Sequence, residues 1–489
     1  MKIKSKIRYT AAVLAAIAVG TTSCGKFGDT NVNPNSVTTP VTSALLTSVE
    51  TFIGADAVGS PTSTASAPIT GFYTPFFVQH WSQIQYPDNS LYPTSGVSWD
   101  SYYAGPMEDL YNIIQVNTAN PNPIAASGNS VNQIQIARIL LAYYYSILTD
   151  RYGDIPYSQA LKGSVTIAYD KQQAIYTDLF AQLASAVSSF QSTGTAITGD
   201  IIYGGDLSKW KRFANSLRLS LAMRLSKVDP ATGKTQFMAA LTDAGGVIDA
   251  NTYNFKLTYP GGTFNYPLYN LTSASVVAIS KPLADLMNGY SDPRVVKYGQ
   301  VNSSNVVKGF PYGLNRSDAL TWIATNPDYS LAFDASLKTS SSTVTIFSAA
   351  YIDLLRAEAA LTYTTGENAL TMLTKGITDS WAQWGVTGNT ATYLAAIGAS
   401  VSAPLAKIQE QEWIALYGSE QNAFDEWRRT GVPVLTPAPD ATNPTKTIPR
   451  RFPYPSGEAN TNGVAYNAAI ASFPYGGSDT ETNRVWWDK

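Results

Sequence analysis

The chain has 489 residues and a formal net charge of −2, with aromatic residues at 12% and charged residues at 14% of the total. Its first 23 residues contain four cations and no acid, so the remainder carries a charge of −6. Nucleic-acid binding depends on clustered Lys and Arg side chains, and this mildly acidic balance excludes it. The length allows one large domain or several ordinary ones.

The N-terminus has the layout of a secretion signal. Four cations precede the apolar run Ala11–Val19, which is too short for the roughly 20 residues that cross a bilayer. Cleavage after Ser23 would expose Cys24, the only cysteine, which has no disulfide partner within the chain. We therefore predict a signal peptide over 1–23, lipidation of Cys24 and a polar tether over 24–40. An ordinary cleaved signal with an incidental Cys24 is the alternative.

Residues 61–105 are rich in Ser, Thr, Pro and aromatic residues, a composition typical of surface loops, where large rings often bind ligands. The single histidine, His80, has no cluster of Cys, Asp or Glu at ligand spacing, so we interpret it as a hydrogen-bonded group rather than a metal ligand or base. Core packing is the commoner role for any one aromatic residue here. The informative rings are Trp81, Tyr86, Tyr92, Trp99, Tyr102 and Tyr103. From these we select Trp81, Tyr92 and Trp99 as candidate ligand-binding residues.

The strongest helical pattern is ARILLAYYYSILTDRYGDIPY, residues 137–157. Apolar side chains recur every three or four residues on two faces, which predicts a central helix covered on both sides. Gly153 and Pro156 predict its end, and the neighbouring charges Asp150, Arg151 and Asp154 are interpreted as a local ion-pair clamp. Further helices are predicted over 170–190, 207–228, 346–361, 369–384 and 405–417. Starts near 131, 170 and 207 favour a mainly α fold of helix pairs stacked in tandem.

Residues 245–344 have little helical period and are rich in Tyr, Asn, Gly, Pro and Ser. About 100 residues of this kind in a compact protein indicate a functional region built from loops rather than a simple connection. Its candidate binding side chains are Tyr266, Tyr269, Tyr290, Tyr312, Arg316, Trp322 and Tyr329. Among them we select Tyr312, Arg316 and Trp322 as ligand-binding residues.

Several segments resemble the SusD/RagB family of outer-membrane nutrient-binding lipoproteins. They are DTNVNPN near the start, YGDIPY after the central helix, WKRFANSLRLSLAMR, the helix ending in WRRTG, IPRRFPYPSGEANTN and the closing RVWWDK. The resemblance covers residues 29–489 and implies one SusD-like domain over 41–489, with tetratricopeptide-like helix pairs. Its ligand-binding part would lie around 61–105 and 245–344.

The same resemblance implies a lipoprotein on the outer membrane that faces the cell exterior. Such a protein binds a nutrient, an oligosaccharide or in some members a peptide, and acts as the lid of a SusC-like TonB-dependent transporter. It implies no enzymatic activity, no cofactor and no metal. The pattern is weakest in the two loop regions, so the sequence does not select the ligand.

Motifs of common enzymes are absent from the sequence: there is no P-loop, dinucleotide fingerprint, nucleophile elbow or zinc spacing. A secreted glycoside hydrolase would need paired carboxylates at one cleft and stays open as an alternative, as does a structural surface lipoprotein without a small ligand. The helical acids Glu358, Glu410 and Glu412 have Arg or Lys nearby, so we interpret them as ion-paired. The cations Arg428, Arg429, Arg450 and Arg451 are interpreted mainly as structural, holding Pro-rich backbone against the helices.

Overall fold

The computed structural model describes residues 40–57, 73–93, 97–120, 125–164, 166–272, 277–473 and 477–489, and Val41–Lys489 forms one unit. The predicted signal peptide, Cys24 and all but the last residue of the tether lie outside the described residues. So does the stretch 58–72 of the aromatic loop region. Among the described helices, none combines the length and the apolar character that a membrane span needs.

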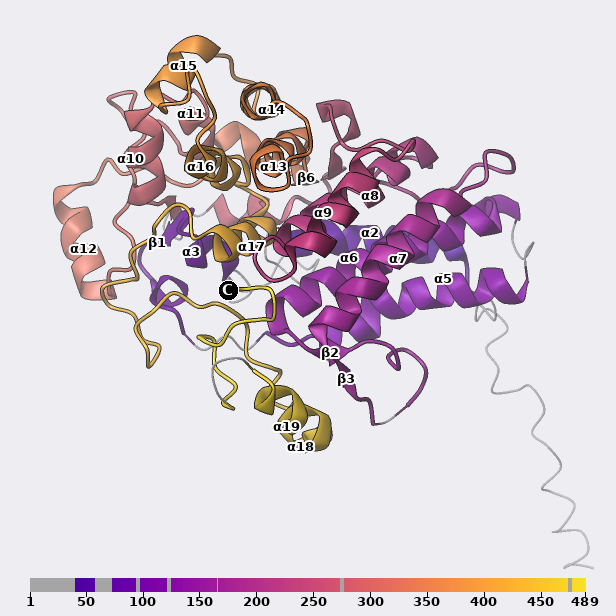
Figure 1. Ribbon diagram of the computed structural model, residues 1–489. Helices are drawn as coiled ribbons and strands as arrows, with labels where there is room; N and C mark the ends of the chain where they lie inside the picture. The colour runs from indigo at the N-terminus through magenta and orange to yellow at the C-terminus, as the bar shows by residue number, and fades with distance from the viewer. Residues whose placement is uncertain are drawn as a thin grey trace, which may run out of the picture. The chain divides into compact units, whose positions relative to one another are not determined.

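Helix α6, Ser130–Tyr152, lies at the centre of the helical layer (Figure 1). The side chain of Asn129 caps its first turn by accepting a hydrogen bond from the amide of Asn132. Helices α5 (Glu108–Ala119) and α7 (Gln172–Ser189) pack against it, and its apolar residues are buried on both faces. It ends at Gly153, whose φ of 92° is open to glycine and strained for other residues. The predicted central helix, covered on both sides, is therefore confirmed.

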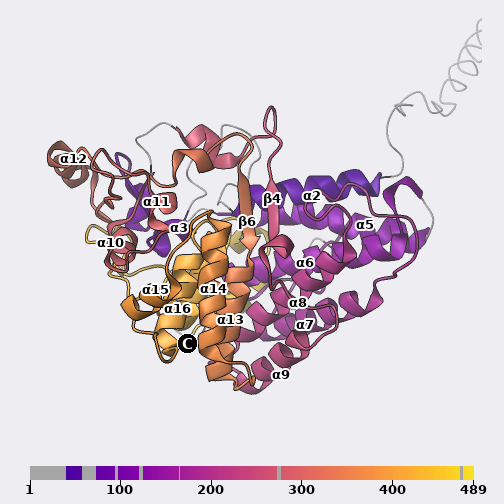
Figure 2. The ribbon, with the colours of Figure 1, turned by 90° about the horizontal axis from the view of Figure 1, so that it is seen from above.

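The layer continues as helices packed in chain order, α5 on α6, α6 on α7, α7 on α8, α8 on α9 and α13 on α14 (Figure 2). This arrangement confirms the mainly α class and is consistent with stacked helix pairs. The remaining helices of the layer are α2 (Thr42–Ala57), α8 (Leu207–Arg224), α9 (Pro230–Leu241), α13 (Ala349–Thr362), α14 (Ala369–Gln383), α16 (Leu405–Ala415) and α17 (Glu420–Thr430). The helix predicted from residue 346 begins later, because Ser348 caps α13 and the preceding residues pair as a strand.

Shorter elements lie outside this layer, and several of them fall in residues 245–344. The helices among them are α3 (Thr74–Phe77), α4 (Asp100–Tyr102), α10 (Lys281–Gly289), α11 (Val295–Tyr298), α12 (Arg316–Thr325), α15 (Thr390–Ala396), α18 (Glu458–Thr461) and α19 (Gly463–Ala471). The strands are β1 (Trp81–Gln83), β2 (Ile155–Pro156), β3 (Tyr169–Asp170), β4 (Phe255–Thr258), β5 (Val277–Ile279) and β6 (Thr343–Phe347). They pair antiparallel as β1–β5, β2–β3 and β4–β6.

Aromatic packing joins the β4–β6 ribbon to the helical layer. The rings of Phe213 in α8 and Phe255 in β4 stack with centroids 3.8 Å apart, and Tyr143 of α6 meets Phe255 edge-on at 5.9 Å. Phe347 of β6 completes the cluster against Phe213. Aromatic pairs of this kind contribute about 0.5–1.5 kcal/mol beyond the area that they bury. The ribbon therefore has a fixed position on the helices.

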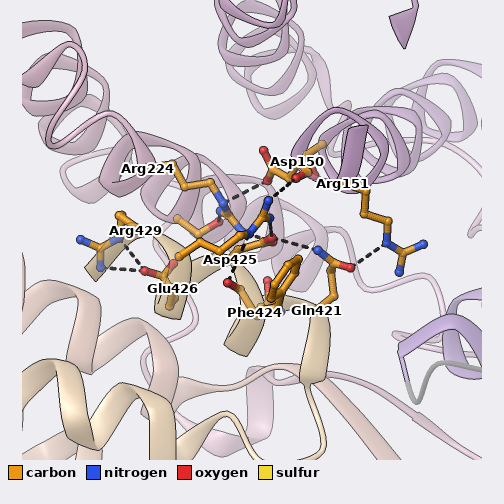
Figure 3. Close-up of polar contacts among 12 residues, drawn as sticks. Asp150, Arg151, Arg224, Gln421, Phe424, Asp425, Glu426 and Arg429 are labelled. Atoms are coloured by element: carbon orange, nitrogen blue, oxygen red, sulfur yellow. Dashed lines mark hydrogen bonds and ion pairs between the residues drawn. The ribbon is translucent and has the colours of Figure 1, made fainter. Parts of the chain in front are cut away.

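A buried chain of charges connects the end of α6 with α8 and α17 (Figure 3). Arg224 lies between two acids, with Nε 3.0 Å from Asp150 Oδ2 and Nη2 2.7 Å from Asp425 Oδ2. Arg428 donates to the backbone oxygen of Asp150 at 2.8 Å and pairs with Asp425. The prediction of a local clamp was wrong for Asp150, because its carboxylate pairs with Arg224 and so joins segments that are far apart in the sequence.

A second buried cluster surrounds Arg429, which is 2% exposed. Its guanidinium contacts Glu358 at 2.7 Å and 2.5 Å, Glu426 at 2.6 Å and Glu412 at 3.5 Å. Outside the cluster, Glu410 pairs with Lys407 at 3.1 Å. These contacts confirm the interpretation of the helical acids as ion-paired.

The other two arginines that the sequence singled out hold the C-terminal segment. Arg450 pairs with Asp488, and Arg451 contacts Asp479 at 2.5 Å and donates to the backbone oxygen of Tyr152 at 3.1 Å. The structural interpretation of these cations is confirmed.

The Arg429 cluster predicts a pH effect at Glu412. Burial, followed by the charge of Glu358, raises the pKa of Glu412 well above its ordinary value. The folded state therefore holds this proton more tightly than the unfolded chain, in which the pKa is about 4.3. The stability that the proton contributes is complete below that unfolded value and declines as the pH rises through the raised pKa.

Glutamine imitates the protonated acid at every pH, so Glu412→Gln should gain stability relative to the wild type as the pH rises. Urea unfolding of both proteins at about pH 5 and about pH 8 measures this difference. A difference that is constant or shrinks with pH would contradict the prediction.

Candidate functional site

A small platform of paired backbone segments precedes Tyr86, an aromatic residue that is largely exposed. Strand β1 pairs with β5 from Trp81↔Ile279 to Gln83↔Val277. Backbone bridges extend β5 on its other side, with Ala278 opposite Leu331 and Ser280 opposite Phe310. Four segments from residues 81 to 332 thus meet in one patch, and their ladder hydrogen bonds fix where its side chains lie.

Helix α12 packs on this platform through a small apolar cluster separate from the main core. Ala319 of α12 is fully buried against Ile84 and Phe310, while Trp322 and Ile323 are partly buried against the same cluster. Asn315 caps the helix by accepting from the amide of Asp318, and Asp440 accepts from the Asn315 amide at 2.8 Å. The position of α12 is therefore set by the bond from Asn315 to Asp440 and by its apolar face.

The α12 surface, which we define as Tyr86, Lys308, Arg316, Trp322 and Tyr329, combines aromatic rings with two cations. The Arg316 guanidinium lies 5.0 Å from the ring centre of Tyr86, whose side chain is 59% exposed. The Lys308 ammonium lies 5.6 Å from the Trp322 ring, and Trp322 meets Tyr329 at 6.2 Å. Such cation–ring contacts contribute about 0.5–1 kcal/mol at exposed sites and hold the rings in place.

The two cations of the α12 surface, Lys308 and Arg316, differ in whether a carboxylate pairs with them. Lys308 Nζ pairs with Asp328 Oδ1 at 2.8 Å, and this hydrogen bond lowers the pKa of Asp328. For Arg316, no ion pair with a carboxylate occurs within the part of the chain that the structure describes. Arg316 is exposed, so its five donors are available to a ligand.

The structure separates the six predicted ligand-binding residues into two groups. Arg316 and Trp322 lie together on α12. The four others, Trp81, Tyr92, Trp99 and Tyr312, are 2%, 0%, 3% and 9% exposed. Their rings pack inside the molecule in this conformation, so they support the site rather than line its surface.

Two of these buried residues are tyrosines held by hydrogen bonds to the backbone of other segments. The hydroxyl of Tyr312 donates to the backbone oxygen of Phe76 at 2.5 Å, and the hydroxyl of Tyr92 accepts from the amide of Ala438 at 3.2 Å. Burial raises the pKa of both tyrosines. Trp99 packs edge-on against Tyr152 at 5.1 Å. Trp99 thus joins its loop to α6, whereas Tyr312 and Tyr92 join segments outside the helical layer to one another.

The sequence did not distinguish Tyr86 from the other aromatic residues of its region. It lies between β1 and the turn at Pro87, and only its exposure separates it from its buried neighbours. A usable signal is that Tyr86 lies in the polar run that follows strand β1. Tyr329, also among the wider set of candidates, completes the group.

His80 has the role that the sequence predicted. Its ring nitrogens lie 2.8 Å from Glu420 Oε2 and 3.0 Å from the backbone oxygen of Trp413, and it is fully buried. The interpretation as a satisfied hydrogen-bonding group is confirmed. Among the described residues, no group of three or more His, Cys, Asp or Glu side chains could hold a metal ion.

Comparison with known proteins assigns the family. Residues 34–455 match the SusD-like family model whose description is "Starch-binding associating with outer membrane". A solved chitin-binding protein is 28% identical, with a TM-score of 0.75 over 91% of this chain and 99% of its own. No curated protein matches the sequence.

Two further structures share the fold. A SusD homologue from Bacteroides uniformis is 25% identical, with a TM-score of 0.76 over 91% of this chain and 99% of that one. A chitin-binding SusD homologue from Flavobacterium johnsoniae is 24% identical, with a TM-score of 0.74 over 91% and 98%. The match over most of the chain, together with the stacked helices and the loop platform, shows that this protein belongs to the SusD-like family.

Proposed function

We propose that this protein is a surface lipoprotein that binds a glycan at the α12 surface and delivers it to a SusC-like TonB-dependent transporter, which it covers as a lid. The observation that carries the binding part is the exposed Tyr86–Arg316 pair at helix α12, which also carries Trp322. Support comes from the family description and from the chitin-binding neighbour at 28% identity. Lipidation of Cys24 would hold the protein beside its partner.

The α12 surface suits a sugar chain for two physical reasons. Aromatic faces pack against the C–H faces of sugar rings, and the exposed Tyr86 and the partly buried Trp322 are the rings available for this. Arg316 carries donors for hydroxyl or acetamide oxygens and has no carboxylate to satisfy among the described residues. Each contact is weak, which suits a protein that must pass its ligand onward.

Calorimetric titration with chitin oligosaccharides and malto-oligosaccharides tests the site. Trp322→Ala and Tyr86→Ala should each lower the affinity for the bound glycan by roughly tenfold, because each removes a ring contact of about 1 kcal/mol or more. Arg316→Ala should weaken binding without disturbing the apolar cluster, since this side chain is exposed. Tyr111→Ala in α5 is the matched control, because it removes a tyrosine from the helical layer, and should leave affinity unchanged.

Each alternative predicts a different result in the same series. Titration with peptides in place of glycans would reveal a peptide binder, for which Arg316 would contact a carboxylate. Release of new sugar ends by the purified protein, abolished by replacing one carboxylate, would establish a glycoside hydrolase. Unchanged glycan affinity in all three α12-surface variants would remove this surface from the proposal.

The anchor and the partner are tested in cells of a native-type host. Wild-type protein should fractionate with the outer membrane and co-purify with a large TonB-dependent barrel in near-equal amount. Cys24→Ala should be released from the membrane in the absence of the barrel, because no lipid is attached. Equal membrane retention of Cys24→Ala without any co-purifying barrel would contradict both the anchor and the partnership.

A further inference from the structure

A cavity in the helical layer, where the end of α7 meets the start of α8, has no part in the proposed glycan site. Its volume is about 600 Å³, within the range of clefts that hold small ligands. Helices α7 and α8 lie apart from α12 in both views, and the described lining residues include no member of the α12 surface (Figure 1 and Figure 2). We call it the α7–α8 cavity and define it by Phe190, Gln191, Ser192, Ser208, Lys211 and Tyr253.

Three charged side chains are among the described lining residues of the α7–α8 cavity, and two of them are engaged with other protein groups. Arg212 Nη1 lies 3.0 Å from Asp249 Oδ1. Asp243 Oδ1 accepts from Asn215 Nδ2 at 3.2 Å and from a backbone amide at 2.7 Å. Lys211 is the third, and within the part of the chain that the structure describes no carboxylate lies at ion-pair distance from its ammonium. The cavity therefore has one cation to offer to a ligand.

Each cation of the cavity lies beside an aromatic ring that also lines it. Lys211 Nζ is 5.9 Å from the ring centre of Phe190, and the guanidinium carbon of Arg212 is 4.1 Å from that of Tyr253. All four side chains are partly exposed, so a ligand in the cavity can reach them. Such cation–ring contacts attract the charged group and hold it in place. The Lys211 ammonium is thus a positioned and accessible partner for one negative charge.

The remaining polar groups of the lining suit a molecule rich in hydroxyls. Ser188, Ser192 and Ser208 bring exposed hydroxyls. A serine hydroxyl both donates and accepts, so it can bond a sugar hydroxyl in either direction. The rings of Phe190 and Tyr253 add apolar surface for the C–H groups of a sugar ring. One unpaired cation matches one carboxylate rather than a phosphate group, which carries close to two charges.

From this combination we infer that the α7–α8 cavity is a second binding site, for an acidic saccharide. The ammonium of Lys211 contacts the carboxylate of a uronate residue, and the hydroxyls and rings of the wall hold the sugar ring itself. The inference goes beyond the proposed function, because it requires neither the α12 surface nor a transporter.

The test is calorimetric titration of the full chain with glucuronate and digalacturonate, each compared with its neutral counterpart, glucose or galactobiose. The acidic sugars should bind saturably and at least tenfold more tightly than the neutral ones, because only they pair with Lys211. Raising the salt concentration from about 0.02 M to about 0.5 M should weaken the binding of the acidic sugars alone, since salt screens accessible charges.

Substitution of Lys211 tests its role in the site. Lys211→Gln should lower the affinity for digalacturonate by about tenfold or more, while Lys211→Arg, which keeps the charge, should retain most of it. Lys209→Gln is the matched control, because it removes the same charge from α8 at a position outside the described lining of the cavity, and it should leave the affinity unchanged. Thermal unfolding midpoints equal to that of the wild type show that the variants are folded.

A substitution on the cavity wall separates repulsion from loss of fold. Ser192→Glu places a second carboxylate in the cavity from an exposed position, so it should abolish the binding of digalacturonate. Ser192→Gln has nearly the same size and no charge, and it should retain the binding.

Acidic sugars that bind no more tightly than neutral ones, or an affinity unaltered by Lys211→Gln, would overturn the inference. Arg316→Ala and Trp322→Ala should leave the binding of digalacturonate intact. Loss of binding in Arg316→Ala without loss in Lys211→Gln would place the carboxylate on the α12 surface and also overturn it. None of these results decides whether neutral glycans bind the α12 surface, which the series with chitin oligosaccharides and malto-oligosaccharides tests separately.

Discussion

Replacing Arg429 with methionine should lower the free energy of unfolding by roughly 3–5 kcal/mol, the usual cost of removing one partner from a buried ion pair. The guanidinium is 2% exposed and satisfies Glu358 and Glu426 through bonds of 2.5–2.7 Å, with Glu412 at 3.5 Å. Methionine fills similar volume, so the loss reports the charge rather than a cavity. The three acids would remain buried together without a cation, and urea unfolding measures the cost.

The loss from Arg429→Met should be smaller at low pH than at high pH, because the orphaned carboxylates can take up protons as the pH falls. Lys281→Met is the matched control, since its partner Asp285 lies in a pair in which both side chains are 55% exposed. Exposed pairs contribute between about 0 and 1 kcal/mol, so this variant should be nearly neutral. Equal losses in the two variants would show that burial does not govern the Arg429 cluster.

Trp487→Ala should cost roughly 3–5 kcal/mol, the range for truncating a large buried aromatic residue. Trp487 is fully buried beside the α6-to-α17 charge network, where its indole donates to Asp150 Oδ1 at 2.7 Å. The Arg428 guanidinium lies 4.7 Å from its ring. One substitution therefore removes packing, a donor to a buried acid and a face for a buried cation.

Two variants divide this loss into its causes. Trp487→Phe keeps most of the ring and removes the donor to Asp150, so it should cost about 1–3 kcal/mol. Trp486→Ala truncates the same residue type at the next position, where the side chain is only partly buried, and should cost less than Trp487→Ala. Similar midpoints for the Trp486 and Trp487 variants in thermal unfolding would contradict the role assigned to burial.

Local sequence determined most of the helical layer. The period of apolar residues, the Gly153 stop and the capping residues act within a few residues, so α6, α7, α8, α14 and α16 lie close to their predicted ranges. The start of α13 was placed too early because the pairing of β6 with β4 depends on residues 255–258, far away in the chain. Family membership also followed from local motifs, and the family match confirms it.

Which aromatic residues face solvent was decided by the tertiary structure alone. Tyr312 and Tyr86 are both tyrosines in loop-like sequence, yet one donates to the backbone of Phe76 inside the molecule and the other is 59% exposed under Arg316. Burial depends on contacts between segments more than 200 residues apart in sequence, as the Tyr312–Phe76 bond illustrates with a separation of 236. No local pattern contains that information.

The buried charges illustrate the same limit, because Arg224 of α8 pairs with Asp150 and Asp425, which lie far from it in the chain. Composition and periodicity thus determined the helices and the family of this protein. The exposure of each ring and the long-range partners of the buried charges arise from packing between distant segments and were visible only in the folded chain.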